Sequence, residues 1–184
     1  MVVTAKTFEQ VALEDPDGRW ELDHGCLRRK PQMTLDHDWL TESLTGALTR
    51  QLDRSEYRVY TNAGRLRVST GSFYIPDVTV IPASYIRQAR LERGGDRLQI
   101  LDRPLPLVVE VWSPSTGEYD VETKLREYQL RRDEEIWRLH PYDHTLTAWR
   151  LQPDGTYTET VYTHGIVELH ALPGVSIDFD ALFD

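Results

Sequence analysis

The chain has 184 residues, a length typical of one domain, and no linker rich in serine, glycine or one kind of charge divides it. We therefore expect a single domain over residues 1–184. Hydrophobic residues make up 40% and charged residues 28%, which is typical of a soluble globular protein, and no apolar run is long enough to span a bilayer. This composition excludes a membrane-spanning protein, so we expect no membrane partner.

The charge of the chain limits its partners. A formal net charge of −9 excludes a protein whose whole surface binds phosphate, but it leaves a local basic groove open. Basic residues cluster at Arg28-Arg29-Lys30 and Arg131-Arg132, which we interpret as solvated faces. The single cysteine, Cys26, excludes an internal disulfide and a thiolate metal cluster. The N-terminal residues lack the apolar core of a signal peptide, so the cytoplasm is the expected compartment.

The first half of the chain predicts helices at its start and then a series of strands. The most regular amphipathic helix covers residues 36–52, where apolar residues recur every three or four positions and Thr34 or Asp36 can cap the first turn. The other predicted elements are a short helix over 8–13, a β-hairpin over 19–28 with its turn at Asp23-His24-Gly25, strands over 57–61, 66–69 and 73–81, and a helix over 83–93 ended by Gly94-Gly95.

The second half predicts a strand, a helix and another strand before a hairpin. The predicted elements are a strand over 107–112, a helix over 121–131, a strand over 135–139, a hairpin of strands 145–151 and 157–163, and a terminal helix over 180–183. This order predicts an α+β (α/β-like) fold with a mixed sheet flanked by helices and with added N- and C-terminal hairpins. Residues 110–139 would form a crossover between neighbouring strands.

Two charged residues stand where the pattern calls for apolar ones. Glu110 lies inside the continuous apolar run from Leu107 to Trp112, which is typical of a strand buried on both faces. A carboxylate there must find a cation, a metal or hydrogen-bond donors, or else take up a proton. Lys124 falls on the apolar face of the following helix, three residues after Val121. The strand therefore places an acidic side chain, Glu110, in the core, and the following helix can place a basic side chain, Lys124, near it.

A third charged residue, Asp77, heads the β-branched stretch that follows Pro76. If its strand neighbours that of Glu110, both carboxylates converge and offer hard oxygen ligands to Mg²⁺ or Mn²⁺, with the backbone carbonyl of Val111 as a third ligand. Such a cation lowers the pKa of a bound water and neutralises charge on a phosphate oxygen, while Lys124 orients the water or stabilises the transition state.

Structural interpretations of the same residues stay open. Asp77 could cap a turn, Glu110 could pair with an arginine, and Lys124 could reach solvent from the helix edge. Glu21 in the first hairpin and His37 in the first turn of the long helix are interpreted as solvated from the pattern alone. The six histidines lack the HExxH spacing of a zinc hydrolase, and the GxSxG, Walker and dinucleotide-binding motifs are absent.

Several motifs in combination resemble one family. They are Pro76-Asp77-Val78, Leu107-Val108-Val109-Glu110-Val111 with Ser113-Pro114-Ser115-Thr116, Asp120 and Lys124 with Tyr128, Trp137 and Pro141, and, toward the ends, Phe8, Trp20-Glu21-Leu22 with Gly25, His37 and Leu172-Pro173-Gly174-Val175 with Leu182. Together they are similar to the Uma-two family of restriction-endonuclease-like proteins in the PD-(D/E)XK nuclease superfamily. The resemblance covers nearly the whole chain and implies a restriction-endonuclease-like fold.

The resemblance also implies a site and a function. Asp77 and Glu110 would be metal ligands, and Lys124 would replace the superfamily lysine, since Trp112 occupies its usual position. Glu21 and His37 become accessory candidates. We expect a Mg²⁺- or Mn²⁺-dependent endonuclease that hydrolyses DNA, with a homodimer formed through the aromatic residues of the C-terminal hairpin. The alternative is a non-enzymatic nucleic-acid or protein-binding module that retains the nuclease fold.

Overall fold

The computed structural model describes residues 2–31, 33–68, 71–93, 98–114 and 117–183, with the backbone alone for residues 93 and 117–121. Its helical elements are α1 (Ala5–Glu14), the 3-10 turn η1 (Pro16–Gly18), α2 (Leu35–Gln51), α3 (Ala83–Arg93), α4 (Gly117–Arg131) and α5 (Asp180–Phe183). Its strands are β1 (Trp20–Asp23), β2 (Cys26–Arg29), β3 (Tyr57–Thr61), β4 (Arg65–Arg67), β5 (Phe73–Tyr74), β6 (Val78–Pro82), β7 (Ile100–Leu101), β8 (Leu107–Val111), β9 (Glu135–His140), β10 (Thr145–Leu151), β11 (Tyr157–Tyr162), β12 (Ile166–Glu168) and β13 (Ser176–Asp178).

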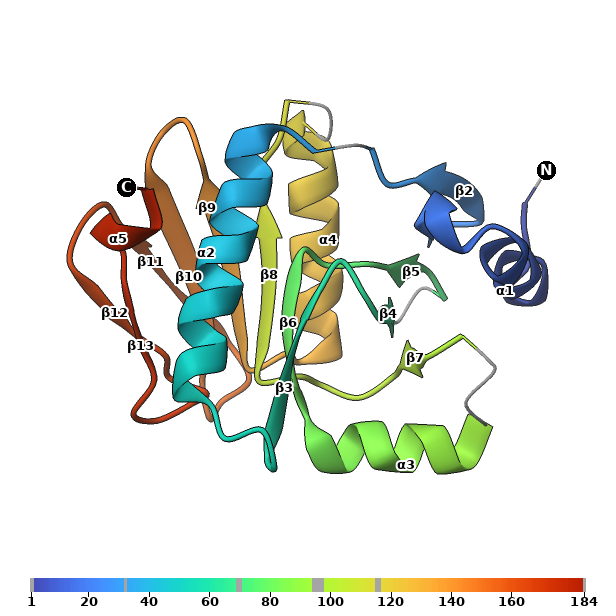
Figure 1. The fold of residues 1–184 in the computed structure, drawn as a ribbon. Helices are drawn as coiled ribbons and strands as arrows, with labels where there is room; N and C mark the ends of the chain where they lie inside the picture. Colours follow the sequence, from blue (N-terminus) through green and yellow to red (C-terminus); the bar gives the residue numbers. More distant parts are fainter. Residues whose placement is uncertain (1, 32, 69–70, 94–97, 115–116, 184) are drawn as a thin grey trace.

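These strands form three sheets, which Figure 1 shows in one view. The central sheet has the order β11-β10-β9-β8-β6-β3, a second sheet has the order β2-β1-β5-β4-β7, and β12 pairs with β13. In the central sheet β8 and β9 run parallel and are joined by α4, whereas the other neighbours are antiparallel. The predicted mixed α+β fold and the predicted crossover are therefore confirmed.

Helices cover both faces of the central sheet. Along β8, Val109 packs in the cluster that contains Leu44 of α2, while Val108 packs in the cluster that contains Tyr128 of α4. This alternation is what a strand buried on both faces requires, because successive side chains point to opposite sides. Glu110 follows the parity of Val108, so its carboxylate points to the side that α4 covers.

Most element predictions are confirmed, and one strand prediction is wrong. The predicted strand over 73–81 divides into β5 and β6, which belong to different sheets, with residues 75–77 between them. Pro76 supplies no backbone donor and therefore favours this break. The helix predicted over 121–131 begins earlier, at Gly117. Predicted features at Ser69, Gly94-Gly95 and Ser115-Thr116 lie outside the described residues.

The prediction that the arginine clusters are solvated is wrong for Arg131. This residue is 8% exposed, and its guanidinium donates to the carboxylate of Asp133 at 2.8 and 2.9 Å and to the backbone oxygens of Leu101 and Arg103. The planar guanidinium group carries enough donors to satisfy all of these acceptors at once. Arg131 therefore fixes the end of α4 to the segment that leads into β8.

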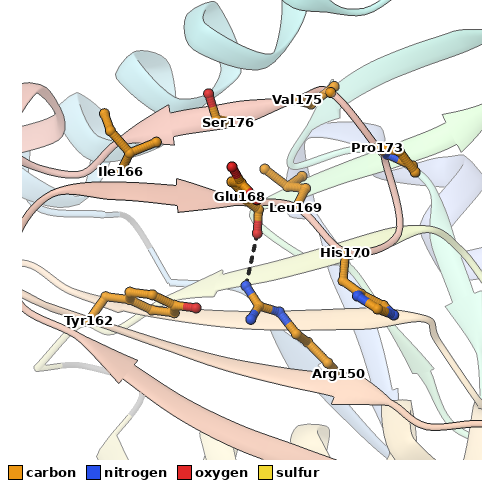
Figure 2. Close-up of a pocket in the computed structure, with 10 residues that line it drawn as sticks. Arg150, Tyr162, Ile166, Glu168, Leu169, His170, Pro173, Val175 and Ser176 are labelled. Carbon is orange, nitrogen blue, oxygen red and sulfur yellow. Dashed lines mark hydrogen bonds between the residues drawn. The ribbon is translucent and has the colours of Figure 1, made fainter.

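The C-terminal segment is attached to the central sheet through Glu135, which is fully buried at the start of β9. One carboxylate oxygen accepts from the indole of Trp137 and from Arg150, and the other accepts from the backbone N–H groups of His170 and Ala171. Beside this anchor lies a hollow of about 710 Å³ between β10, β11 and the β12–β13 pair. Figure 2 shows Arg150 in this hollow with its bond to the backbone of Glu168.

Within the described ranges, no helix combines the length and the apolar character that crossing a membrane requires.

Replacing Glu135 with alanine should destabilise the fold by about 3–5 kcal/mol, because Arg150 and two backbone N–H groups lose a buried acceptor. Urea unfolding followed by circular dichroism would measure this change. Glu134→Ala is the matched control, since its side chain is exposed on the preceding residue, and it should change stability by less than about 0.5 kcal/mol. Equal effects of both substitutions would contradict the anchoring role.

Candidate active site

The two acids expected as ligands come from neighbouring strands of the central sheet. Asp77 directly precedes β6, and β6 pairs antiparallel with β8 in a register that places Val78 opposite Val109. The next position along this ladder brings Asp77 to Glu110, and the backbone N–H of Asp77 donates to the carbonyl of Val109 at 3.1 Å. Both residues are buried, with 1% and 9% of their surface exposed. The predicted neighbouring strands are thus observed.

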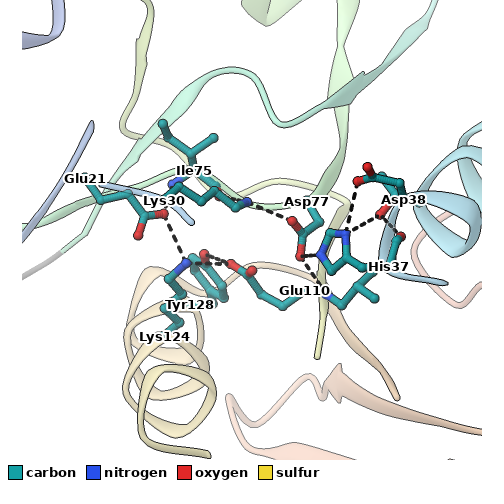
Figure 3. Close-up of polar contacts among 11 residues, drawn as sticks. Glu21, Lys30, His37, Asp38, Ile75, Asp77, Glu110, Lys124 and Tyr128 are labelled. Carbon is teal, nitrogen blue, oxygen red and sulfur yellow. Dashed lines mark hydrogen bonds and ion pairs between the residues drawn. The ribbon is translucent and has the colours of Figure 1, made fainter. Parts of the chain in front are cut away.

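Three segments of the chain surround the carboxylate of Asp77 (Figure 3). Its Oδ1 lies 2.8 Å from Nζ of Lys30, which directly follows β2. Its Oδ2 accepts from the backbone N–H of Val111 at 2.7 Å and lies 3.2 Å from Nε2 of His37 in α2. Burial acts to raise the pKa of Asp77, but Lys30 and His37 outweigh it, so the pKa falls below its ordinary value of 3.8. Asp77 is therefore an anion at neutral pH.

Glu110 has different neighbours on the α4 side of the sheet. Its Oε1 accepts from the hydroxyl of Tyr128 at 2.6 Å and lies 3.4 Å from Nζ of Lys124. Burial raises the pKa of Glu110 above its ordinary value of 4.5; Lys124 opposes this shift, and the negative charge of Asp77 adds to it. Of the two acids, Glu110 therefore takes up a proton more readily.

Lys124 joins Glu110 to a third acid. Its ammonium donates to Oε1 of Glu21 at 3.0 Å, and the same oxygen accepts from the backbone N–H of Ile75 at 2.7 Å. Burial acts to lower the pKa of Lys124, yet Glu110 and Glu21 raise it above its ordinary value of 10.5. Lys124 therefore carries its positive charge at neutral pH and can stabilise negative charge.

Apart from Val111, whose predicted contribution is a backbone carbonyl, the predicted site residues lie in one buried group with Lys30 and Tyr128. This group is called the acid–lysine cluster and consists of Glu21, Lys30, His37, Asp77, Glu110, Lys124 and Tyr128. The interpretation of Glu21 and His37 as solvated is wrong, because they are 5% and 0% exposed. Neighbouring acids and bases compensate for the cost of burying them. Val111 contributes its N–H to Asp77, whereas the role of its carbonyl stays a prediction.

Sequence reasoning missed Lys30, which was assigned to a solvated basic cluster but is 7% exposed. One signal could have identified it. The chain contains 18 arginines but only three lysines, Lys6, Lys30 and Lys124. Because arginine supplies nearly all of the positive charge, a lysine close to apolar strands is unusual enough to suggest a particular task. Tyr128 was predicted as an apolar position, and its hydroxyl bond to Glu110 left no sequence signal.

Comparison with known proteins identifies the family. The pattern of the Uma2 family, described as "Putative restriction endonuclease", matches residues 5–180. The chain belongs to the Uma2 family. This confirms the resemblance drawn from the motifs, and the match spans every element that contributes to the acid–lysine cluster. A comparison with curated proteins found no match.

A solved structure shares the fold of this Uma2 chain. It is described as the "Crystal structure of a putative nuclease belonging to DUF820 from Anabaena variabilis". The two chains are 17% identical, the match covers 89% of each, and the TM-score is 0.73. At this identity the likeness shows the fold alone, and it confirms the predicted nuclease-like architecture.

The cluster of this Uma2 chain offers oxygen atoms suited to a hard cation, although it is not a preformed cage of side chains. In the described part of the chain, no three His, Cys, Asp or Glu side chains form a metal-binding group. However, Oδ1 of Asp77 is buried, and among the described residues its polar contact is the Lys30 ammonium at 2.8 Å, with no further hydrogen bond of good geometry. The carboxylates of Asp77 and Glu110 are hard oxygen ligands of the kind that fits Mg²⁺ or Mn²⁺, which typically uses only one or two protein carboxylates.

Replacing Asp77 with asparagine should destabilise the fold at pH 7 by about 3 kcal/mol, because Lys30 keeps its buried charge without its counter-ion. Because the pKa of Asp77 is lower in the folded protein than its unfolded value of 3.8, the ionised carboxylate stabilises the fold fully at pH values above 3.8. This stabilisation is lost as pH falls through the folded pKa. Urea unfolding of both proteins between pH 7 and pH 3 should therefore show a difference in the free energy of unfolding that is constant down to about pH 4 and becomes smaller below it. A difference independent of pH down to pH 3 would contradict this assignment.

Proposed function

We propose that this Uma2 protein is a metal-dependent endonuclease that hydrolyses DNA phosphodiester bonds with Mg²⁺ or Mn²⁺. One observation carries the proposal: Asp77, directly before β6, and Glu110, in the neighbouring β8, are both buried, and the Lys124 ammonium is 3.4 Å from Glu110. Membership of a family described as "Putative restriction endonuclease" supports the same reaction and a nucleic-acid substrate.

The proposed roles follow from the contacts of each side chain. Asp77 and Glu110 would hold the cation, together with the carbonyl of Val111. When bound, a divalent cation lowers the pKa of a coordinated water and neutralises charge that develops on the phosphate. Lys124, held by Glu21, orients the attacking water and stabilises the negative charge of the transition state. Tyr128 fixes the orientation of the Glu110 carboxylate through its hydrogen bond.

The two carboxylates would divide the work because their surroundings shift their pKa values in opposite directions. Asp77 is held as an anion by Lys30 and His37, whereas burial favours the protonated form of Glu110. Paired acids with separated pKa values are typical of sites that handle protons. Of the two acids, Glu110 is therefore protonated first as pH falls, and because a ligand carboxylate must be ionised, cation binding should weaken as pH falls through its pKa.

A non-enzymatic binding module remains the second candidate, and the burial of the cluster favours it. The Asp77 side chain is 2% exposed and the Lys30 side chain is 3% exposed, and they already neutralise one another. Such a neutralised, buried cluster could have a purely structural role, in which it holds α2, β2 and the central sheet together. Metal binding and cleavage separate the two candidates.

Glu110→Gln and Lys124→Met should each reduce Mn²⁺-dependent nicking of plasmid DNA by about 100-fold or more, because each removes charge needed in the transition state. Supercoiled DNA resolved on an agarose gel would measure this loss. Glu56→Gln is the matched control for Glu110→Gln, since Glu56 is exposed before β3, and it should cleave at the wild-type rate. If the wild type neither binds Mn²⁺ by calorimetry nor nicks DNA, the nuclease proposal fails.

A homodimer formed through the C-terminal hairpin also stays a prediction. Trp149, the tryptophan of the C-terminal hairpin, is only 6% exposed and so contributes little to an interface. The apolar side chain left exposed on β11 is Val161, at 54%. Light scattering coupled to size exclusion should give twice the chain mass, and Val161→Glu should reduce it to the mass of one chain.

A further inference from the structure

Lys30 occupies a position that resembles a cation-binding site. Its Nζ donates to the backbone carbonyl of Ile75 at 2.6 Å and lies 2.8 Å from Oδ1 of Asp77. Carbonyl and carboxylate oxygens are also the atoms that Mg²⁺ and Mn²⁺ choose in proteins. The lysine side chain is 3% exposed, so the ammonium is enclosed with these oxygens and does not extend from the surface.

The oxygen that Lys30 contacts is the one that a metal ion would need. The other oxygen of Asp77, Oδ2, already accepts the Val111 N–H at 2.7 Å and faces His37 at 3.2 Å. Of the two Asp77 oxygens, Oδ1 is the one with no hydrogen bond of good geometry to a described residue, and its polar contact is the Lys30 ion pair. A cation that approaches Asp77 must therefore reach the atom beside which the Lys30 ammonium lies.

The kind of side chain at position 30 supports a particular role. Lysine presents a compact point charge, whereas arginine presents a broad planar fork. The chain carries 18 arginines and three lysines, and two of those lysines lie in the acid–lysine cluster. Lys124 forms ion pairs with Glu21 and Glu110, and Lys30 forms an ion pair with Asp77. Each lysine thus neutralises a different part of the group of three acids.

We propose that Lys30 is a tethered cation at the metal position of Asp77, so that the lysine and a divalent cation compete for Oδ1. This inference rests on the proposed function, because it assigns Lys30 a place in the same metal site. Two positive charges cannot share one carboxylate oxygen at contact distance without strong repulsion. Binding of a divalent cation at Asp77 therefore requires the Lys30 ammonium to move away, and Lys30 sets the cation concentration at which the site is filled.

Lys30→Met tests this competition, since methionine has a similar length without the charge. Isothermal titration with Mn²⁺ should give an affinity about tenfold or more above that of the wild type, because a like charge has been removed from the binding position. Lys6→Met is the matched control at an exposed lysine in α1, and it should bind Mn²⁺ as the wild type does. An affinity unchanged or weakened in folded Lys30→Met protein would overturn the proposal.

A second measurement uses the wild-type protein and does not depend on the folding of a variant. An amine-reactive label read by mass spectrometry should modify Lys30 several-fold faster as Mn²⁺ fills the site, because the ammonium leaves its enclosed position. Lys6 serves as the internal control, with a rate that Mn²⁺ does not change. A Lys30 rate that stays constant while calorimetry shows Mn²⁺ binding would overturn the proposal.

The outcomes distinguish this inference from the proposed function. If Mn²⁺ binds the wild type, binding is lost in Glu110→Gln, and neither Lys30 measurement responds, then the metal site stands and the role of Lys30 is wrong. If Mn²⁺ binds neither the wild type nor Lys30→Met, the metal-dependent function itself fails, and the competition fails with it.

Discussion

The carboxylate of Asp77 is the contact on which the arrangement of this protein depends. A buried carboxylate is costly unless positive charge and hydrogen-bond donors surround it. Here Lys30 comes from the end of the N-terminal hairpin, His37 from the first turn of α2, and the N–H of Val111 from β8. One side chain therefore ties the second sheet, the long helix and the central sheet together. The same requirement that organises the fold also gathers the groups of the candidate site.

Glu110 shows how a second acid on the neighbouring strand acquires a different character. It is bound by a tyrosine hydroxyl and faces a lysine that Glu21 also holds, so its share of positive charge is smaller. Its pKa is raised, while that of Asp77 is lowered. The separation arises from the β6–β8 register and from α4, which places Lys124 and Tyr128 on the same helix face one turn apart.

The fold and much of the candidate site could be predicted because they rest on local patterns. Helical spacing predicted α2 and the buried position of Lys124, and the apolar run predicted β8 with Glu110 buried in it. Glu21 and His37 were misjudged by pattern, because alternation on one strand or one helix turn does not reveal a neighbour distant in sequence. The contact between Glu21 and Lys124 joins residues 103 positions apart. Only the family resemblance pointed to these two residues.

Lys30 marks the limit of prediction from pattern in another way. It follows two exposed arginines, so charge patterning assigned it to a solvated run. What buries it is the return of residues 75–77 beside the hairpin, where the chain passes from β5 to β6 and presents the Ile75 carbonyl and Asp77. That passage exists because one apolar stretch is shared between two sheets, the same feature that made the predicted strand over 73–81 wrong. The wrong prediction of one strand over 73–81 and the failure to predict that Lys30 is buried therefore have the same cause.

The charge of the acid–lysine cluster explains how a protein of net charge −9 could accept a phosphate. Its three acids, Glu21, Asp77 and Glu110, face two ammonium groups, so the cluster alone leaves no positive charge for a nucleic acid. Under the function proposed above, a divalent cation bound at the site would reverse that balance and would displace Lys30 from Asp77. The resulting local excess of positive charge would match a phosphodiester, although the net charge of the chain is negative. Attraction for the substrate would then arise with the cation and be confined to the place where the bond is cut.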